Sequence, residues 1–226
     1  MAARPLGVFG GTFDPVHMGN LRLAEEACAA LGLARVLWLP AGRPPHRPQP
    51  ETSAEHRLEM VRLAIAANPR FTLDAQEVRS DAPSYTVITL ENLRQRLGAE
   101  QPLVLLLGAD AYAGLTAWHR WSEIFSLAHL GVASRSEQSL EPTALPAPLG
   151  DELRVRHADA DRDPVHAAAT LAARPAGRIA TFALIPLDIS ATRIRTGLAA
   201  GLSPRYLLPD PVLYYIERHR LYRPSH

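Results

Sequence analysis

The residues best suited to phosphate chemistry lie near the start of the chain, in the stretch Gly10–Asn20 (GGTFDPVHMGN). An apolar segment, Leu6–Phe9, precedes this stretch and a helix-like segment, Leu21–Leu31, follows it. Gly10 and Gly11 lack a Cβ, so the backbone there can turn sharply and lie close to a bound group. The helix that follows offers unpaired N–H groups and the positive end of its dipole, both of which attract phosphate. The stretch is therefore predicted to be a phosphate-binding junction between a strand and a helix.

Two polar side chains stand at the mouth of that helix. His17 and Asn20 are three residues apart, so in a helical first turn they share one face and can point at the same anion. Taken on its own, the glycine pair Gly10–Gly11 is explained more simply as an ordinary turn that binds nothing.

A second candidate phosphate site lies far along the chain, at Ile189–Arg195 (ISATRIR). Ser190 is a good N-cap residue, so a helix is predicted to begin at Ala191. Thr192 and Arg195 share one face of that helix, and an arginine can hold phosphate oxygens through two parallel hydrogen bonds. For Ser190 alone, an ordinary helix cap explains the residue equally well.

A redox dinucleotide site is not supported. The fingerprint of such sites is G-x-G-x-x-G, with an acidic residue at the end of the second strand. Here the glycines are Gly7, Gly10 and Gly11, and the second predicted strand ends in Leu39–Gly42, which has no acidic residue.

Length and composition bound the remaining choices. The chain has 226 residues, is 47% hydrophobic and carries a net charge of +1, so we expect one domain with a sizeable core and no broad nucleic-acid surface. The single cysteine, Cys28, cannot form an internal disulfide, which fits a reducing compartment. Neither a signal peptide nor an apolar run of about 18 residues is evident. We expect a soluble cytoplasmic protein without membrane contact.

Apolar runs alternate with helical patterns along the chain, which predicts an α/β fold with a doubly wound parallel sheet. Strands are expected at Leu6–Phe9, Arg35–Leu39, Phe71–Glu77, Leu103–Leu107, Leu130–Ser134 and Ile179–Ile185. Helices are expected at Leu21–Leu31, Ala54–Ala67, Thr86–Leu97, Ala191–Ala200 and Pro211–His219. Thr52 and Glu55 have the spacing of a capping box. Residues 136–177 are expected to form short helices and loops, with one helix at Val165–Ala173.

The opening stretch resembles the nucleotidyltransferase signature G-G-T-F-D-P-x-H-x-G-H at every position except the last, where this chain has Asn20. Ile189–Arg195 resembles a second signature of the superfamily, I-S-x-T-x-I-R, in full. The chain is most similar to the bacterial nicotinate-nucleotide adenylyltransferases. The further stretches that carry this resemblance are Pro44–Arg47, Pro83–Thr86, Gly108–Asp110, Trp118, Tyr206–Pro209 and Tyr215–Tyr222.

The resemblance covers nearly the whole chain and is weakest between residues 136 and 177. It implies a Rossmann-like nucleotidyltransferase fold in a single domain, 1–226, with a C-terminal helical part at about 190–222. It also implies a reaction in which ATP and nicotinate mononucleotide give deamido-NAD and pyrophosphate. Mg²⁺, held mainly by the substrate phosphates, is the implied cofactor.

The family pattern also implies residue roles. His17 would contact the α-phosphate, and the catalytic set would be His17, Asn20 and Arg195. The implied ATP-binding residues are Gly10, Gly11, Thr12, Phe13, His17, Asn20, His46, Arg47, Gly108, Asp110, Ile189, Ser190, Thr192 and Arg195. The implied residues for nicotinate mononucleotide are Thr12, Ser84, Tyr85, Thr86, Asp110, Trp118, His119 and Arg135.

Among these, Trp118 would stack on the pyridine ring. The backbone N–H groups of Thr86 and His119 would bind its carboxylate. Asp110, which is expected to end a buried strand, would bind ribose hydroxyls, with a helix cap as its simpler explanation. Arg135 is a candidate ligand for the phosphate of the mononucleotide.

Two alternatives remain at this point. The first is a related nucleotidyltransferase that acts on nicotinamide mononucleotide, phosphopantetheine or a choline phosphate. The second is a nucleotide-binding regulator whose catalysis is weakened, because Asn20 carries no charge where the family has a histidine. The expected partners are ATP and nicotinate mononucleotide, and neither nucleic acid nor a membrane. The sequence does not predict the oligomeric state.

Overall fold

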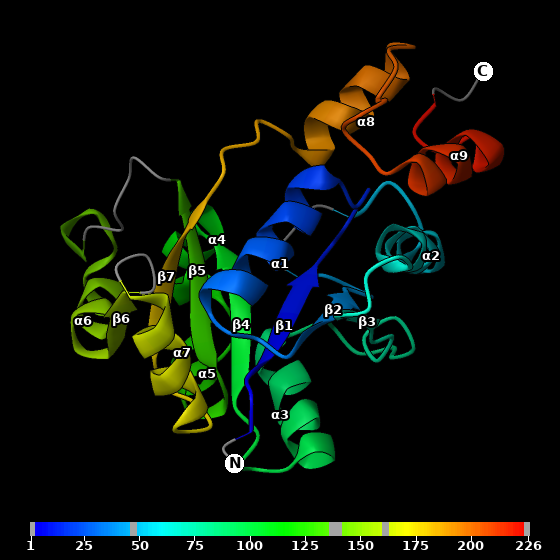
Figure 1. Cartoon of the computed structure of the whole chain (residues 1–226). Coiled ribbons are helices and arrows are strands. Elements are labelled where there is room, and N and C mark those ends of the chain that lie inside the picture. Colours follow the sequence, from blue (N-terminus) through cyan, green and yellow to red (C-terminus); the bar gives the residue numbers. More distant parts are fainter. Residues whose placement is uncertain (1–2, 46–48, 136–141, 160–162, 224–226) are drawn as a thin grey trace. The chain divides into compact units, whose positions relative to one another are not determined.

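The structure is a computed structural model that describes residues 3–45, 49–135, 142–159 and 163–223 (Figure 1). Strands and helices alternate along the chain. The strands are β1 (Leu6–Gly11), β2 (Arg35–Pro40), β3 (Phe71–Leu73), β4 (Leu103–Gly108), β5 (His129–Arg135), β6 (His157–Asp159) and β7 (Ile179–Leu184). The α-helices are α1 (Met18–Ala30), α2 (Ala54–Ile65), α3 (Thr86–Leu97), α4 (Ala109–Ala113), α5 (Ile124–Leu127), α6 (Ala147–Arg156), α7 (Pro164–Ala172), α8 (Ala191–Ala199) and α9 (Asp210–His219). Three 3₁₀ turns are η1 (Leu115–Ala117), η2 (Trp121–Glu123) and η3 (Pro142–Ala144).

The strands form a seven-stranded sheet in the order β3-β2-β1-β4-β5-β7-β6. β4 runs parallel to β1 and to β5, and β7 runs parallel to β5 and to β6. The strand order therefore proceeds outward in one direction from β1 and in the other direction from β4. This reversal is the defining feature of a doubly wound α/β sheet, and it confirms the predicted fold class.

The contacts of the chain divide it into two compact units. The first unit comprises residues 1–10, 23–37 and 85–186, and the second comprises residues 11–22, 38–84 and 187–226. Each unit is described by itself below. The expectation of a single domain spanning 1–226 stays a prediction.

The core of the first unit is built around β4. Every side chain of Leu103–Leu107 is buried, as expected for a parallel strand that is covered on both faces. On the neighbouring strand β5, a Cβ added to Gly131 would lie 2.8 Å from the Cδ1 atom of Leu31. A larger residue at position 131 would therefore displace Leu31, so the glycine sets the close approach of this part of the core to the sheet.

One arginine of this unit joins several backbone segments through hydrogen bonds. The guanidinium of Arg94, at the end of α3, donates to the backbone carbonyls of Leu127 (2.8 Å) and Pro175 (2.7 Å) and to others nearby. Burial lowers its pKa, but the carbonyl oxygens supply the acceptors that a buried cation needs.

The second unit is built from α2, α8, α9, β3 and the loop that follows β1. α2 and α9 pack through buried apolar side chains, among them Met60, Val61, Val212 and Ile216. The Pro40–Arg43 segment is held tightly here, because a Cβ added to Gly42 would lie 2.2 Å from the carbonyl oxygen of Glu77. Only a glycine allows the two backbones to approach so closely.

Most element boundaries lie within a few residues of those predicted, and four expectations need correction. α2 is capped by Ser53, whose Oγ accepts from the N–H of His56 (3.3 Å), and not by Thr52. β3 ends at Leu73 and does not extend to Glu77, because residues 74–79 form turns. Asp110 does not end a buried strand, since it is exposed in the first turn of α4.

The fourth correction concerns the segment for which the sequence was least informative. Residues 142–177 contain the short helices α6 and α7, in line with the expectation of short helices there, and α7 was predicted within one residue; the strand β6 was not predicted. β6 is only three residues long and pairs with β7 alone, so it has no extended apolar pattern that a sequence could reveal.

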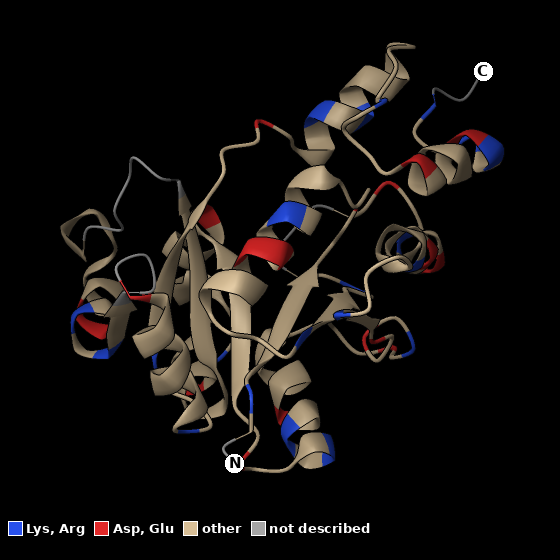
Figure 2. Ribbon diagram, viewed as in Figure 1, with Lys and Arg blue, Asp and Glu red and all other residues tan. Residues whose placement is uncertain are grey.

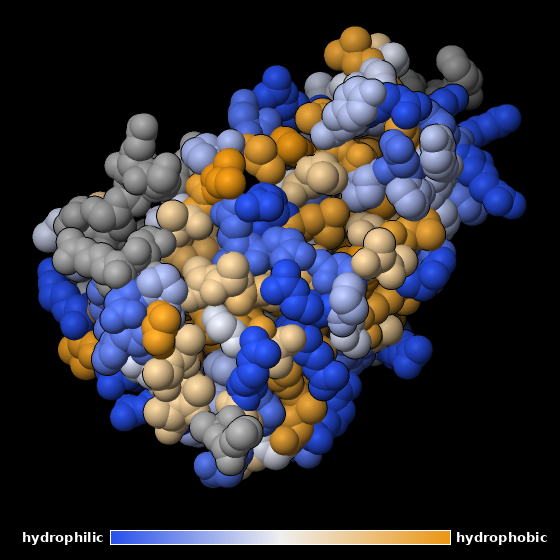
Figure 3. Space-filling view, viewed as in Figure 1, coloured by the Kyte–Doolittle hydropathy of each residue, from blue (hydrophilic) through white to orange (hydrophobic). Residues whose placement is uncertain are grey.

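Basic and acidic residues are interspersed along the described elements (Figure 2), as the net charge of +1 suggests. The face drawn in Figure 3 likewise mixes hydrophilic and hydrophobic side chains. Within the described ranges, no helix is long and apolar enough to cross a membrane.

Candidate nucleotide-binding site

The loop after β1 is largely buried in the second unit. Phe13 has a positive φ of 51°, and its ring lies 5.3 Å from the ring of Trp38. A Cβ added to Gly11 would lie 3.0 Å from the Phe13 ring, so the ring covers the backbone of the predicted phosphate turn. The left-handed backbone of Phe13 is a strained conformation that the surrounding packing must maintain.

His17 and Asn20 are linked to each other at the start of α1. The Oδ1 atom of Asn20 accepts a hydrogen bond from the backbone N–H of His17 (3.0 Å), and the backbone N–H of Asn20 donates to the carbonyl of His17 (2.9 Å). The first of these bonds is one half of a capping box, in which the N3 side chain accepts from the N–H of the N-cap residue, here His17, and the second is an ordinary backbone turn. The side-chain oxygen of Asn20 is therefore engaged within the helix start, and its Nδ2 group is the donor that remains.

The His17 ring is held in its neutral form. Its Nδ1 atom is buried and has no hydrogen-bond partner among the described residues. Burial lowers the pKa of His17 to about 4, because the charged ring would lose its hydration. An anion brought close to the ring would raise this pKa again.

The first N–H of α1 is already used. Met18 donates its backbone N–H to the carbonyl of Leu207 (3.0 Å), which lies in the segment between α8 and α9. The anion site predicted at this helix start therefore has fewer free donors than the sequence suggested. The same contact fixes the C-terminal segment against the opening loop.

The second signature forms the N-terminus of α8, as predicted. Ser190 is the N-cap, and its Oγ accepts from the N–H of Arg193 (3.2 Å). The carbonyl oxygen of Ile189 lies 3.7 Å from the position that a Cβ on Gly19 would occupy. The starts of α1 and α8 therefore lie side by side within the second unit, and both offer N–H groups and positive dipole ends to an anion.

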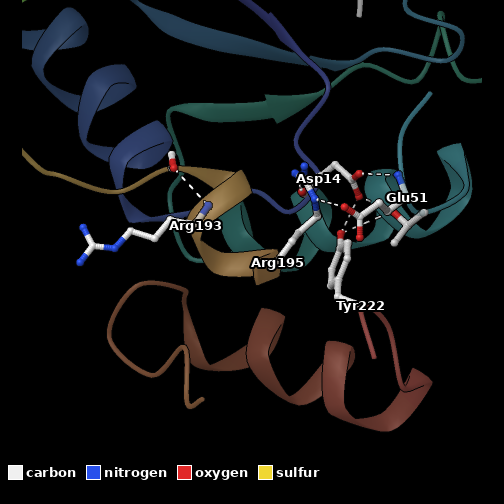
Figure 4. Close-up of polar contacts among 7 residues, drawn as sticks. Asp14, Glu51, Arg193, Arg195 and Tyr222 are labelled. Atoms are coloured by element: carbon white, nitrogen blue, oxygen red, sulfur yellow. Dashed lines mark hydrogen bonds and ion pairs between the residues drawn. The ribbon is translucent and has the colours of Figure 1, made fainter. Parts of the chain in front are cut away.

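Arg195 connects α8 to the opening loop (Figure 4). Its Nε donates to the Glu51 carboxylate (2.6 Å), and its Nη1 donates to the backbone carbonyl of Asp14 (2.8 Å). The sequence predicted that Arg195 lies along the triphosphate, and the structure adds that two of its three nitrogens already have protein partners. Arg193, its neighbour in the sequence, is exposed and pairs with Asp188 (2.7 Å).

The candidate residues for the mononucleotide lie mainly in the first unit. Tyr85 is the N-cap of α3 and makes no side-chain capping bond. Its ring lies 4.4 Å from the ring of His119. Thr86 is the first residue of α3, and its backbone N–H lies at the positive end of the helix dipole. The structure thus brings the rings of Tyr85 and His119 together beside the start of α3, and their role in binding the mononucleotide stays a prediction.

Trp118 directly precedes His119 and is half-buried, so one part of its ring faces solvent. The next residue, Arg120, has a φ of 51° and forms ion pairs with Glu91 of α3 (2.8 Å) and Glu123 (2.6 Å). These contacts tie the loop that carries Trp118 to α3. Such exposed pairs contribute little to stability.

Comparison with known proteins identifies the family. The cytidylyltransferase-like family model matches residues 8–197. The probable nicotinate-nucleotide adenylyltransferase of Dechloromonas aromatica is 58% identical over 223 residues, which are 99% of this chain and 100% of that protein. The chain belongs to the cytidylyltransferase-like family and, within it, to the nicotinate-nucleotide adenylyltransferases.

Other relatives of this adenylyltransferase family agree. The probable nicotinate-nucleotide adenylyltransferase of Pseudomonas putida (strain W619) is 47% identical, with 98% of this chain and 96% of that protein covered. The solved nicotinic acid mononucleotide adenylyltransferase of Plasmodium falciparum, complexed with NaAD, has a TM-score of 0.69 over 97% of both chains at 12% identity. At that identity the structural match shows the fold alone.

The remaining predicted site residues of this adenylyltransferase are placed as follows. Ser84 braces the loop after β2, because its Oγ accepts from the N–H groups of Gly42 (3.0 Å) and Arg43 (3.1 Å). Gly108 is the N-cap of α4. Arg135 is the last residue of β5, and its side chain lies outside the described part. His46 and Arg47 also lie outside the described residues.

The sequence did not indicate a set of four polar residues, three of them buried and Thr52 half-buried, that supports the opening loop. These residues are Asp14, Thr52, Arg57 and Tyr222. Asp14 stands inside the first signature, but the signature gives no partner for it. Thr52, Arg57 and Tyr222 are separated from Asp14 by 38 to 208 positions in the sequence, so no local pattern could have linked them.

Proposed function

We propose that this chain transfers the adenylyl group of ATP to nicotinate mononucleotide, giving deamido-NAD and pyrophosphate. The observation that carries the proposal is the pair of adjacent helix N-termini in the second unit, at His17–Asn20 and Ser190–Arg195. Each belongs to one of the two signatures of the family. Together they provide donors and positive dipole ends of the kind that a triphosphate requires.

In the proposed reaction a phosphate oxygen of the mononucleotide attacks the α-phosphorus of ATP. A new P–O bond forms, the bond from the α-phosphorus to the oxygen that bridges to the β-phosphate breaks, and pyrophosphate leaves with that electron pair. The phosphate is already a competent nucleophile, so no general base is needed. The protein contributes position and stabilises the charge that develops on the transferred group.

His17 is assigned to the α-phosphate in this proposal. Since the ring is neutral, with a pKa of about 4, it acts first as a hydrogen-bond donor. Approach of the phosphates favours its protonated form. Arg195 lies in the same unit, and we assign its guanidinium to the triphosphate together with His46 and Arg47.

Mg²⁺ is proposed as the cofactor, held mainly by the substrate phosphates. Among the described residues, no group of three or more His, Cys, Asp or Glu side chains could hold a metal ion. An ion that arrives with its nucleotide keeps several waters, which is the usual manner of binding for Mg²⁺. When bound, the ion neutralises charge on the phosphates.

The first unit is proposed to select the acid form of the pyridine. The start of α3 carries backbone N–H groups without a side-chain cap, and such a helix end favours a carboxylate over a neutral amide. Trp118 offers a flat face for the ring. The lone cysteine, Cys28, is buried and forms no disulfide, which fits the cytoplasmic location that we propose.

The test is a parallel assay of pyrophosphate release from ATP. Nicotinate mononucleotide, nicotinamide mononucleotide and phosphopantetheine are supplied separately, each with Mg²⁺. We expect release with nicotinate mononucleotide to exceed that with the other two. Faster release with either competitor would reassign the substrate, and no release with any of the three would overturn the enzymatic proposal.

A further inference from the structure

We propose that Tyr222, near the end of the chain, is a positioning residue for ATP: its hydroxyl fixes Asp14, and Asp14 in turn holds Arg195. This inference rests on the proposed function, because it assumes that Arg195 contacts the triphosphate. Every residue in the argument belongs to the second unit. Figure 4 shows how the side chains converge on the opening loop.

The Asp14 carboxylate is the centre of the arrangement. It is 4% exposed and accepts three hydrogen bonds. The Tyr222 hydroxyl donates to Oδ1 (2.6 Å), the Thr52 hydroxyl also donates to Oδ1 (2.7 Å), and the backbone N–H of Glu51 donates to Oδ2 (2.8 Å). A buried carboxylate with three donors has one orientation, so its backbone is fixed as well.

The same residue then controls Arg195. The backbone carbonyl of Asp14 accepts from Arg195 Nη1 (2.8 Å), while the Glu51 carboxylate accepts from Arg195 Nε (2.6 Å). Glu51 is itself anchored through its N–H to Asp14. Both protein acceptors of the guanidinium therefore depend on the carboxylate that Tyr222 holds, and the remaining nitrogen, Nη2, is directed by the other two.

A buried cation completes the support. Arg57 is 1% exposed and donates to the backbone carbonyls of Thr12 (2.9 Å) and Gly42 (3.0 Å), among others. It also lies close enough to Asp14 for the two charges to attract each other. Arg57 thus fixes the residue two positions before Asp14 and balances its charge. Tyr222 supplies the contact from the far end of the chain.

Tyr222 contributes through its hydroxyl, which an isosteric substitution removes. It is 8% exposed, and burial beside Asp14 raises its pKa, so the hydroxyl stays protonated and can donate. Its backbone φ is 61°, a value that phenylalanine must adopt at the same cost. Tyr222→Phe therefore isolates the hydrogen bond.

The test measures binding of a non-hydrolysable ATP analogue by calorimetry, and steady-state kinetics with both substrates. We expect Tyr222→Phe to weaken binding of the analogue and to lower kcat/KM for ATP by about tenfold, because one hydrogen bond to a buried charge is lost. The KM for the mononucleotide should change by less than about twofold. Tyr214→Phe removes the hydroxyl of a tyrosine that is 55% exposed on α9 and should leave all values unchanged.

Two further variants separate positioning from stability. Val212→Ala destabilises the same unit through packing, at a buried position of α9. If Val212→Ala weakens binding of the ATP analogue as much as Tyr222→Phe does, the proposal is overturned. The second variant combines Tyr222→Phe with Arg195→Gln. If Tyr222 acts through Arg195, Tyr222→Phe has no further effect on binding of the analogue in the Arg195→Gln background, and a full additional tenfold loss would refute the proposed route.

These outcomes are distinct from a failure of the proposed function. Binding of the ATP analogue is measured without the mononucleotide, so it does not depend on which second substrate is used. If wild type releases no pyrophosphate but binds the analogue, the function fails while the test of Tyr222 still stands. If wild type is active and Tyr222→Phe binds the analogue as wild type does, only the role of Tyr222 fails.

Discussion

The Oδ1 atom of Asn20 accepts a hydrogen bond of 3.0 Å from the backbone N–H of His17. Asn20 is the one residue that departs from the first signature. The contact gives it a structural role, since a side chain that accepts at this position helps to cap α1. A neutral histidine can accept through a ring nitrogen, so both residue types can serve the helix start. Only histidine could add a positive charge.

Substitution of Asn20 tests this relationship. Asn20→His should leave kcat unchanged or raise it, because the acceptor is kept and a charge becomes available. Asn20→Ala should lower the free energy of unfolding by about 1 kcal/mol through loss of the cap, and should lower kcat. Steady-state kinetics and denaturant unfolding measure the two effects. A collapse of kcat in Asn20→His would show that packing around Asn20 excludes the larger ring.

His17 is expected to act in the chemical step more than in ATP binding. His17→Ala should lower kcat by at least about tenfold, because the side chain no longer positions the α-phosphate or stabilises its developing charge. Affinity for the ATP analogue should change by less than about threefold. Single-turnover kinetics and calorimetry measure these quantities separately. An unchanged kcat would remove His17 from the mechanism.

Two serine caps offer a matched comparison. Ser53 and Ser190 cap α2 and α8 through hydrogen bonds of 3.3 and 3.2 Å. Substitution of either by alanine should lower the free energy of unfolding by about 1 kcal/mol. Only Ser190→Ala should also raise the KM for ATP, because α8 alone carries the second signature. Equal effects of both variants on this KM would mean that Ser190 is a structural cap and nothing more.

The sequence predicted the features that depend on residues close together in the chain. The strand–loop–helix junction at Gly10–Asn20 and the cap at Ser190 were both predicted, because glycine and N-cap preferences act over a few residues. The cap at Thr52 was predicted wrongly, for a reason that the neighbouring residues in the sequence cannot reveal. The hydroxyl of Thr52 donates to Asp14 (2.7 Å), a residue 38 positions earlier, so Ser53 takes the capping role.

The candidate site shows the same limit. Tyr85 and His119 were both predicted from family patterns, but their contact at 4.4 Å depends on how the chain returns to α3. Asp110 was predicted at the end of a strand, and the structure places it in α4 because β4 ends two residues earlier, at Gly108. A continuous apolar run fixes the middle of a buried strand far better than its last residue.

The two tryptophans that flank His119 and Arg120 should behave differently. Trp118→Ala should raise the KM for the mononucleotide by about tenfold or more, which corresponds to the loss of one ring stack. Trp121 packs edge-on against Phe125, with ring centroids 6.2 Å apart. Since Trp121 is half-buried, Trp121→Ala should lower the free energy of unfolding by about 1–2 kcal/mol with a smaller change in this KM. The same rise in both variants would argue against a specific role for Trp118.

His129 makes the stability of the first unit depend on pH. The ring is fully buried, its Nδ1 accepts from the N–H of Arg178 (3.0 Å), and its Nε2 faces the carbonyl of Arg174 (2.9 Å). The neutral ring with its proton on Nε2 satisfies both contacts. A second proton on Nδ1 would point at an N–H group, and burial together with the nearby charges of Arg94 and Arg174 opposes it, which lowers the pKa to about 4.

The unfolded chain therefore binds more protons than the folded chain between the unfolded pKa of about 6.5 and the folded pKa of about 4. Stability is complete above about pH 6.5 and falls as the pH decreases through this window. Between pH 7 and pH 5 we expect His129 to account for a loss of about 2 kcal/mol in the free energy of unfolding. Urea unfolding at both pH values measures the loss in wild type and in His129→Gln, which cannot titrate. Wild type and His129→Gln share the contribution of His17. Between pH 7 and pH 5 the variant should therefore lose about 2 kcal/mol less free energy of unfolding than wild type. An identical loss in the two proteins would show that His129 titrates normally.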